Sequence, residues 1–203
     1  DRITMAGFGN SQYRSREIGE ALRALDLARI IQIIYPTTNL EPPVIPDLKR
    51  KPRLQFLDTG LLNHALGIQS DLLGLMDLNS IYKGRLIQHL AAQQFQAQTT
   101  SPLYKTVFWV REKANSNAEV DLVYQSGKYI IPVEVKSGAK GSLRSLHQFV
   151  ERSENKIAIR LLANRFSLEK TRTPAGTPYL LLNMPYYTST RIQNYAEWLL
   201  SQV

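Results

Sequence analysis

The chain contains two strand-like segments close together, Ala118-Glu-Val-Asp-Leu-Val-Tyr124 and Tyr129-Ile-Ile-Pro-Val-Glu-Val-Lys136. Between them lies Gln125-Ser-Gly-Lys128, a short polar stretch with a glycine. Two strand-like segments joined by a stretch of this kind are typical of a β-hairpin. The sequence therefore predicts an antiparallel pair of strands over residues 118–137.

Successive strand side chains point to opposite faces, so this hairpin would have one charged face and one apolar face. With Gly127-Lys128 as the loop, Asp121 faces Glu134. With Ser126-Gly127 as the loop, the same residues become diagonal neighbours on the same face. The charged face would carry Glu119, Asp121, Glu134 and Lys136. The apolar face would carry Val120, Leu122, Tyr124, Ile131, Val133 and Val135.

Opposed carboxylates on adjacent strands have Cβ atoms about 4.5–5.5 Å apart, close enough to share one divalent cation. Asp121 and Glu134 would repel each other without a cation, and Lys136 could orient a water or neutralise a phosphate. The alternative is a charged face that meets water, with Glu119 and Lys136 as a cross-strand ion pair. The pattern alone favours this simpler alternative.

Asp121, twelve intervening residues and Glu134-Val-Lys136 resemble the core motif of the PD-(D/E)XK nuclease superfamily. Three segments in order are more specific, namely 51–62, 118–123 and 131–138. They resemble a domain of unknown function at the C-terminus of bacterial and archaeal AAA-type ATPases. The resemblance implies an α/β fold with a restriction-endonuclease-like core, which is a mixed central sheet flanked by helices. It also implies an ATPase domain upstream.

The resemblance further implies a site for Mg²⁺ or Mn²⁺ held by Asp121, Glu134 and the backbone carbonyl of Val135. A metal there would polarise a phosphate and activate water, and Lys136 would position that water or neutralise developing charge. The catalytic residues implied are therefore Asp121, Glu134 and Lys136.

Many members of the superfamily add a glutamate from the first core helix, four residues after a glycine. Here Gly84 is followed at that spacing by Gln88, which brings no charge. The loss of this charge weakens the expected metal affinity. Glu119, on the same predicted face as the other carboxylates, would compensate in part.

Basic residues suggest a nucleic-acid partner. The chain carries 25 Lys and Arg against 17 Asp and Glu, a net charge of +8. Eight Lys and Arg but only three Glu lie in 137–172, and a basic surface beside the site would track DNA. Within it, Lys140 and Arg144 are the expected contacts, and the small residues of 137–142 could meet a phosphate. Alternatively, the basic residues form an ordinary solvated surface, and 137–142 is a flexible connection between a strand and a helix.

Residues 1–40 resemble the winged-helix segment that precedes the domain of unknown function. A helix is expected from an N-cap at Ser15, with Ile18, Ala21, Leu22 and Leu25 as its apolar stripe. Arg16 and Arg23 would share the opposite face and contact nucleic acid, or would simply be solvated. A strand over 29–35 and a turn over 36–39 follow.

The prolines at 42, 43 and 46 and a basic run make 41–52 a linker, which divides the chain into 1–40, 41–52 and a main domain over 53–203. Residues 111–117 are expected to form a loop. No functional role is expected for His147. Further strands are expected over 53–57, 105–110, 156–162 and 179–182, and helices over 61–66, 81–97, 143–152 and 191–200.

Composition excludes several classes of function. The chain has no Cys and three scattered His, so a zinc site or a thiolate nucleophile is not expected. It has no G-x-x-x-x-G-K-[ST] motif, so ATP hydrolysis is not expected of this piece. No stretch would span a membrane, and a cytoplasmic location is expected.

Three functions remain open. They are metal-dependent hydrolysis of DNA, nucleic-acid binding without cleavage, and contact with a protein partner. The sequence leaves the oligomeric state open.

Overall fold

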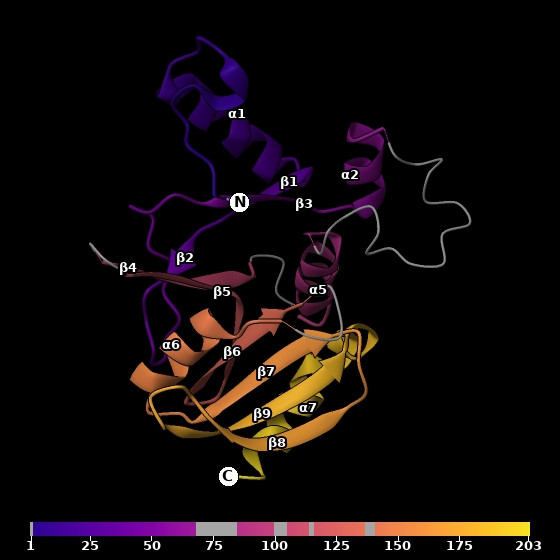
Figure 1. Ribbon diagram of the computed structural model, residues 1–203. Coiled ribbons are helices and arrows are strands. Elements are labelled where there is room, and N and C mark those ends of the chain that lie inside the picture. Colours follow the sequence, from indigo (N-terminus) through magenta and orange to yellow (C-terminus); the bar gives the residue numbers. More distant parts are fainter. Residues whose placement is uncertain (1, 68–84, 100–104, 114–115, 137–140) are drawn as a thin grey trace. The chain divides into compact units, whose positions relative to one another are not determined.

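The computed structural model describes residues 2–67, 85–99, 105–113, 116–136 and 141–203 (Figure 1). The chain forms two compact units. The first comprises Asp1–Pro36 and Asp47–Leu78, and the second comprises Thr37–Pro46 and Asn79–Val203. The candidate catalytic residues all belong to the second unit.

The first unit is built around a two-stranded sheet. Strand β1 (Ile31–Ile34) pairs antiparallel with β3 (Arg53–Phe56). The expected strand at 53–57 is therefore confirmed, and its partner is β1. Leu22 of helix α1 (Ser15–Leu27) is buried in one cluster with Ile31 and Ile33. The unit also contains η1 (Phe8–Asn10) and α2 (Thr59–Ala65).

Two helix starts in this unit follow from local hydrogen bonds. Asp58 caps α2, since its Oδ1 accepts from the backbone N–H of Leu61 at 2.8 Å. The expected N-cap at Ser15 is wrong by one residue, because Arg14 is the cap and its N–H donates to Glu17 Oε2 at 2.8 Å. In α1, Leu22 is buried, whereas Ala21 and Leu25 are exposed.

A seven-stranded mixed sheet dominates the second unit, in the order β2-β4-β5-β6-β7-β9-β8. Strands β4, β5 and β6 pair antiparallel, β6, β7 and β9 pair parallel, and β8 is antiparallel to β9. The expected α/β class with a mixed central sheet flanked by helices is confirmed. The strands are β2 (Pro36–Thr37), β4 (Val107–Lys113), β5 (Ser116–Ser126), β6 (Tyr129–Val135), β7 (Ile157–Leu162), β8 (Ser167–Arg172) and β9 (Pro178–Pro185).

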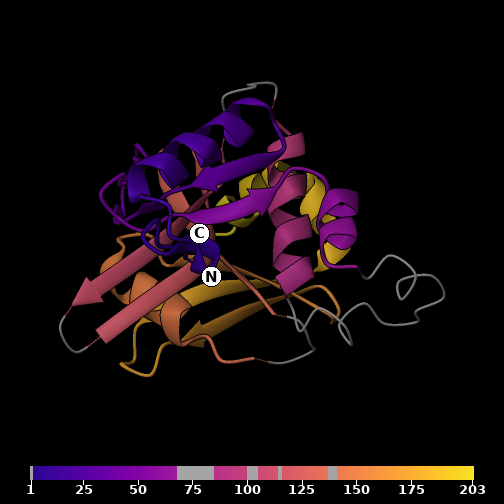
Figure 2. The same ribbon diagram turned by 90° about the horizontal axis from the view of Figure 1, so that it is seen from above.

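Helices cover both faces of this sheet (Figure 2). Helices α5 (Arg85–Ala97) and α7 (Ile192–Leu200) pack on one face, and η2 (Tyr186–Arg191) leads into α7. Helix α6 (Arg144–Arg152) packs on the other face through Leu146, Phe149 and Val150. The Phe149 ring meets the Trp109 ring edge-on, with centroids 5.2 Å apart.

The hairpin is present as β5 and β6. Leu122 faces Val133 and Ser126 faces Tyr129, so Gly127 and Lys128 form the two-residue loop. Gly127 has a φ of 54°, a conformation that a residue with a side chain adopts reluctantly. The first of the two expected registers is therefore the observed one.

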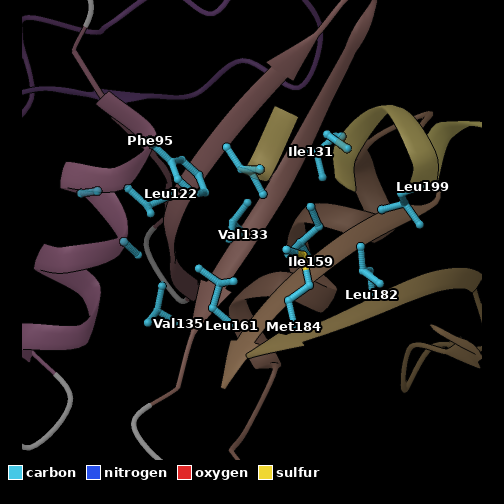
Figure 3. Close-up of a cluster of buried hydrophobic side chains, with 14 of the residues drawn as sticks. Phe95, Leu122, Ile131, Val133, Val135, Ile159, Leu161, Leu182, Met184 and Leu199 are labelled. Atoms are coloured by element: carbon cyan, nitrogen blue, oxygen red, sulfur yellow. The ribbon is translucent and has the colours of Figure 1, made fainter. Parts of the chain in front are cut away.

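The main core lies between the sheet and helices α5 and α7 (Figure 3). It contains the inward residues of β6, β7 and β9 together with residues of both helices. Most of the expected apolar hairpin face contributes to it, namely Leu122, Tyr124, Ile131, Val133 and Val135.

Val120 departs from the expected apolar face. It packs with Val123, three residues later, in a separate cluster that includes Phe149 of α6. The register of β4 against β5 shifts here, because Val107 faces Val123 while Trp109 faces Val120. An extra residue in β5 breaks the period of two, as in a β-bulge. The prediction that the alternation continues unbroken along β5 is therefore wrong.

Other differences concern strands. Residues 36–37, expected in a turn, form β2, and the described part of 111–117 extends β4 and β5 rather than forming a loop. Strand β8 was not predicted, because Ser-Leu-Glu-Lys-Thr-Arg carries a single apolar residue. As an edge strand, β8 gains its stability from backbone pairing with β9 and needs no fully buried face.

In the described part of the chain, no helix combines the length and the apolar character needed to cross a membrane.

Candidate functional site

The Asp121 carboxylate lies where the β5–β6 ladder ends. The paired residues stop at Leu122 and Val133, and one further step of the register sets Asp121 opposite Glu134. Asp121 Oδ2 accepts a hydrogen bond from the backbone N–H of Val135 at 2.9 Å. The side chain of Asp121 thus takes the place of a backbone carbonyl and fixes it against the end of β6.

Glu134 and Lys136 lie on the same side of β6, two residues apart. Lys136 Nζ lies 2.5 Å from Glu134 Oε1, and the Glu134 side chain is only 8% exposed. A buried carboxylate is costly unless an opposite charge and hydrogen bonds compensate it. Lys136 supplies that compensation here. The expected cross-strand pair of Lys136 with Glu119 is replaced by this pair within one strand.

The structure fixes the backbone of Lys136 on both sides. Its N–H donates to the carbonyl of Leu161 in β7 at 2.8 Å, and its carbonyl accepts from the hydroxyl of Tyr186. Tyr186 comes from the first residue of η2, and sequence reasoning missed it. No local sequence pattern indicated the contact of Tyr186 with Lys136, because 50 residues separate the two.

Gly141 holds the side chain of Lys136 in place. A Cβ built on Gly141 would lie 2.6 Å from Lys136 Cδ and 2.9 Å from Cγ, so only a glycine allows the present path of the lysine. Sequence reasoning treated 137–142 as a phosphate-binding or flexible connection and did not link it to Lys136. Residues 137–140, including the expected DNA contact Lys140, lie outside the described residues.

Gln88 sits on the sheet-facing side of α5. It follows the buried Ile87 and precedes the buried Ala92 and Phe95 by four and seven residues, which is the spacing of one helix stripe. Ile87 and Val135 belong to the same core cluster. The structure therefore brings this turn of α5 to the end of β6. Among the described contacts, no hydrogen bond joins Gln88 to the charged residues.

Glu119 does not join this group by strand alternation. Its neighbours Ala118 and Val120 both pack in the cluster beneath Phe149, so Glu119 points to the opposite face of the sheet. Its backbone N–H donates to Ser145 Oγ at 3.3 Å. The register shift in β5 lies between Val120 and Val123, so Asp121 falls within it and the prediction that Glu119 and Asp121 share one face by alternation is wrong.

A second polar group continues from Glu134 across the sheet. Arg160 of β7 lies opposite both Glu134 and Asn183 of β9. Arg160 Nε donates to Asn183 Oδ1 at 2.7 Å, and Asn183 Nδ2 donates to Glu169 Oε1 at 2.5 Å and to Ser167 Oγ at 2.9 Å. The buried Asn183 amide is thus bonded through both its oxygen and its nitrogen, and it fixes the direction of Arg160.

His147 of α6, which had no assigned role, is bound to β9. Its Nε2 lies 3.0 Å from the hydroxyl of Tyr179. Burial lowers the pKa of His147, and the Glu151 carboxylate partly opposes this. Burial raises the pKa of Tyr179, where Arg160 acts in the opposite direction and Glu169 in the same one. The pair connects α6 to the sheet as neutral groups.

The expected basic contacts are exposed where they are described. Arg144 is the first residue of α6. Arg16 and Arg23 lie on α1 in the first unit, with Arg16 Nε bonded to Glu20 Oε1 at 2.8 Å. The Arg23 guanidinium lies against Gly19. The pairing with Glu20 partly neutralises the expected basic face of α1.

The donor set implied for a metal consists of two carboxylates and one backbone carbonyl. No group of three or more His, Cys, Asp and Glu suited to a metal occurs among the described residues. Asp121, Glu134 and Val135 nevertheless meet at one strand end, because the Asp121 carboxylate is bonded to the Val135 amide. Hard oxygen donors are those that Mg²⁺ prefers, so the chemistry of the set fits this ion.

Comparison with known proteins identifies one segment. Residues 83–180 match the model of a family described as a domain of unknown function (DUF4143). The matched segment contains Gln88, Asp121, Glu134 and Lys136, and it excludes α1. Comparisons with curated proteins and with solved structures give no significant match. The expected similarity to a domain of unknown function is confirmed for this segment, and its description names no activity.

Proposed function

We propose that the second unit is a DNA-associated module of restriction-endonuclease-like fold that hydrolyses phosphodiester bonds with Mg²⁺ or Mn²⁺. One observation carries the proposal, namely the bonded group of Asp121, Val135, Glu134 and Lys136 at the end of β6. Two carboxylates and a lysine on adjacent strands are what this chemistry requires. The arrangement also matches the resemblance of the sequence to PD-(D/E)XK nucleases.

Each side chain has a definite part in this proposal. Asp121, fixed by the Val135 amide, and Glu134 would hold the metal, which when bound would polarise the phosphate and acidify a water. The Lys136 ammonium, already directed at Glu134, would stabilise negative charge that develops on the phosphate. The resemblance of residues 1–40 to a winged helix further suggests that the module acts with an upstream AAA-type ATPase domain.

A second candidate function is nucleic-acid binding without cleavage. Gln88 favours it, because an uncharged amide stands on the sheet-facing side of α5 where the resemblance leads one to expect a glutamate. A site with one carboxylate fewer binds a divalent cation more weakly. Contact with a protein partner is the third candidate function. The metal and DNA experiments described next distinguish it from the other two.

Calorimetric titration of Mg²⁺ and of Mn²⁺ tests the proposal. Asp121→Asn and Glu134→Gln should each abolish saturable binding, and Glu154→Gln, an exposed carboxylate after α6, should leave it unchanged. Cleavage of duplex, single-stranded and branched DNA should then be lost in the same two variants. Metal binding without cleavage would favour the second candidate. If the chain binds neither metal nor DNA, contact with a protein partner is the remaining candidate function.

A further inference from the structure

Three aromatic rings form a cluster on the surface of the second unit, one just before the edge strand β8 and two on α7. The Phe166 ring lies 5.6 Å from the Tyr195 ring and 5.6 Å from the Trp198 ring, measured between centroids. Phe166 directly precedes β8, and Tyr195 and Trp198 are one turn apart on α7. We call these residues the aromatic cluster.

Two of the three rings remain open to solvent. Phe166 is 43% exposed and Trp198 is 38% exposed. The opposite side of α7, with Ile192, Ala196 and Leu199, is fully buried in the main core. The buried side of α7 thus anchors the cluster in the core, while the outer surfaces of Phe166 and Trp198 are exposed.

Two cations lie on the elements that bear the aromatic cluster. Leu168 of β8 packs against the core beneath α7, and alternation places the exposed Lys170 on that same face of the strand. Arg191 is exposed at the end of η2 and is the N-cap residue of α7, four residues before Tyr195.

The carboxylates of β8 and α7 point elsewhere. Glu169 lies on the other face of β8, where it accepts a hydrogen bond from Asn183. Glu197 is about 200° around the helix from Tyr195 and accepts from Gln193 Nε2 at 3.1 Å. The elements that bear the aromatic cluster therefore combine exposed rings with positive charge.

We propose that the aromatic cluster, with Lys170 and Arg191, binds single-stranded nucleic acid, with bases stacked on Phe166 and Trp198 and phosphates on the two cations. Aromatic rings interspersed with cations are the elements of single-strand binding, because every base offers a face for stacking. Charge complementarity selects this occupant over an apolar peptide. The inference rests on the proposed association with DNA and is independent of the metal and of hydrolysis.

Tryptophan fluorescence provides a direct test. The chain has two tryptophans. Trp109 is 2% exposed and is shielded from a ligand, so a stacked base would quench Trp198 alone. The titrant is an oligothymidylate of about 15 nucleotides, in EDTA so that no metal contributes. Blunt duplex and inorganic polyphosphate are the comparison ligands.

The expected result is quenching by the single strand and little or none by duplex or polyphosphate. Phe166→Leu should weaken single-strand binding about 5- to 100-fold. Tyr187→Leu, which alters an exposed ring outside the cluster, should leave the affinity unchanged. Lys170→Gln and Arg191→Gln should each lower the slope of log K against log salt by about 0.7, and these surface variants stay informative if Phe166→Leu fails to fold.

Several outcomes would overturn the inference. One is equal quenching by polyphosphate, which would mean charge attraction without stacking. Another is equal affinity of Phe166→Leu and Tyr187→Leu. A change of Trp198 fluorescence with protein concentration alone would make the cluster a contact between copies of the chain. Loss of metal binding with single-strand binding intact would instead count only against the proposed hydrolysis.

Discussion

The ammonium of Lys136 lies 2.5 Å from Oε1 of Glu134, and one residue of β6 separates the two in sequence. Because the Glu134 carboxylate is buried, its negative charge depends on this partner. The relationship concerns stability as well as chemistry. The ion pair of Lys136 and Glu134 stabilises the charged end of β6 in the folded protein even without a metal.

Replacing Lys136 by methionine keeps the unbranched apolar stem and removes the charge. We expect Lys136→Met to lower the free energy of unfolding by about 1–3 kcal/mol, since the buried Glu134 carboxylate loses its ion pair with the Lys136 ammonium. Chemical denaturation measures this, with Lys170→Met as an exposed control on β8. Equal destabilisation by Lys136→Met in the wild-type and Glu134→Gln backgrounds would disprove the coupling.

Gly141→Ala tests how the lysine is positioned. The new Cβ would meet Lys136 Cδ at 2.6 Å, so the lysine must move and its ammonium should leave Glu134. We expect a clear fall in any metal-dependent cleavage with little change in secondary structure by circular dichroism. Ser142→Ala, next in sequence, is the control. Full activity of Gly141→Ala would show that the present path of Lys136 is not required.

Gln88→Glu adds a carboxylate on the sheet-facing side of α5. If the end of β6 binds Mg²⁺, a third carboxylate nearby should tighten binding about tenfold, because hard cations prefer charged oxygen ligands. Isothermal calorimetry gives the affinity. Gln94→Glu, on another side of the same helix, should have no such effect. Equal affinities in the two variants would place the metal away from α5.

Asn183→Ala removes the buried amide that joins Arg160 to Glu169 and Ser167. We expect a loss of about 1–3 kcal/mol in the free energy of unfolding, because the change removes the hydrogen bonds that this buried amide makes to Arg160, Glu169 and Ser167. Asn194→Ala on the exposed side of α7 should change little. Similar unfolding midpoints for both variants would mean that solvent replaces the amide without cost.

His147 predicts a dependence of stability on pH. Burial lowers its pKa in the folded protein, so the unfolded chain binds the proton more readily. Stability due to the neutral ring is therefore complete above the unfolded pKa of about 6.5 and falls as the pH drops through the folded value. Thermal unfolding at pH values on both sides of this range measures it. In His147→Gln this part of the pH dependence should disappear, and its persistence would assign it to other groups.

Local patterns in the sequence predicted the hairpin and most of the helices, and they limited the hairpin to two registers. Gly127 marks the tight turn, and apolar residues at alternate positions define the strand faces on both sides of it. The helix expected over 61–66 is present as α2, and the Asp58 side chain that caps its start is likewise a local interaction. Such features depend on residues that lie within a few positions of one another.

Features that depend on distant residues were not predictable in this way. Strand β8 has no apolar pattern and is recognisable only because β9 lies beside it. The shift in β5 follows from pairing with β4, and it removes Glu119 from the expected group.

The sequence by itself determined the hairpin, the apolar face of β6 and the pair of carboxylates that flank the turn. Only the tertiary structure decided the partners of Lys136, because Tyr186 and Leu161 reach it from η2 and β7. It also decided that Phe166 meets Trp198. The physical reason is that a residue's neighbours along the chain set its backbone conformation, whereas the sheet order and helix packing set which distant side chains it meets.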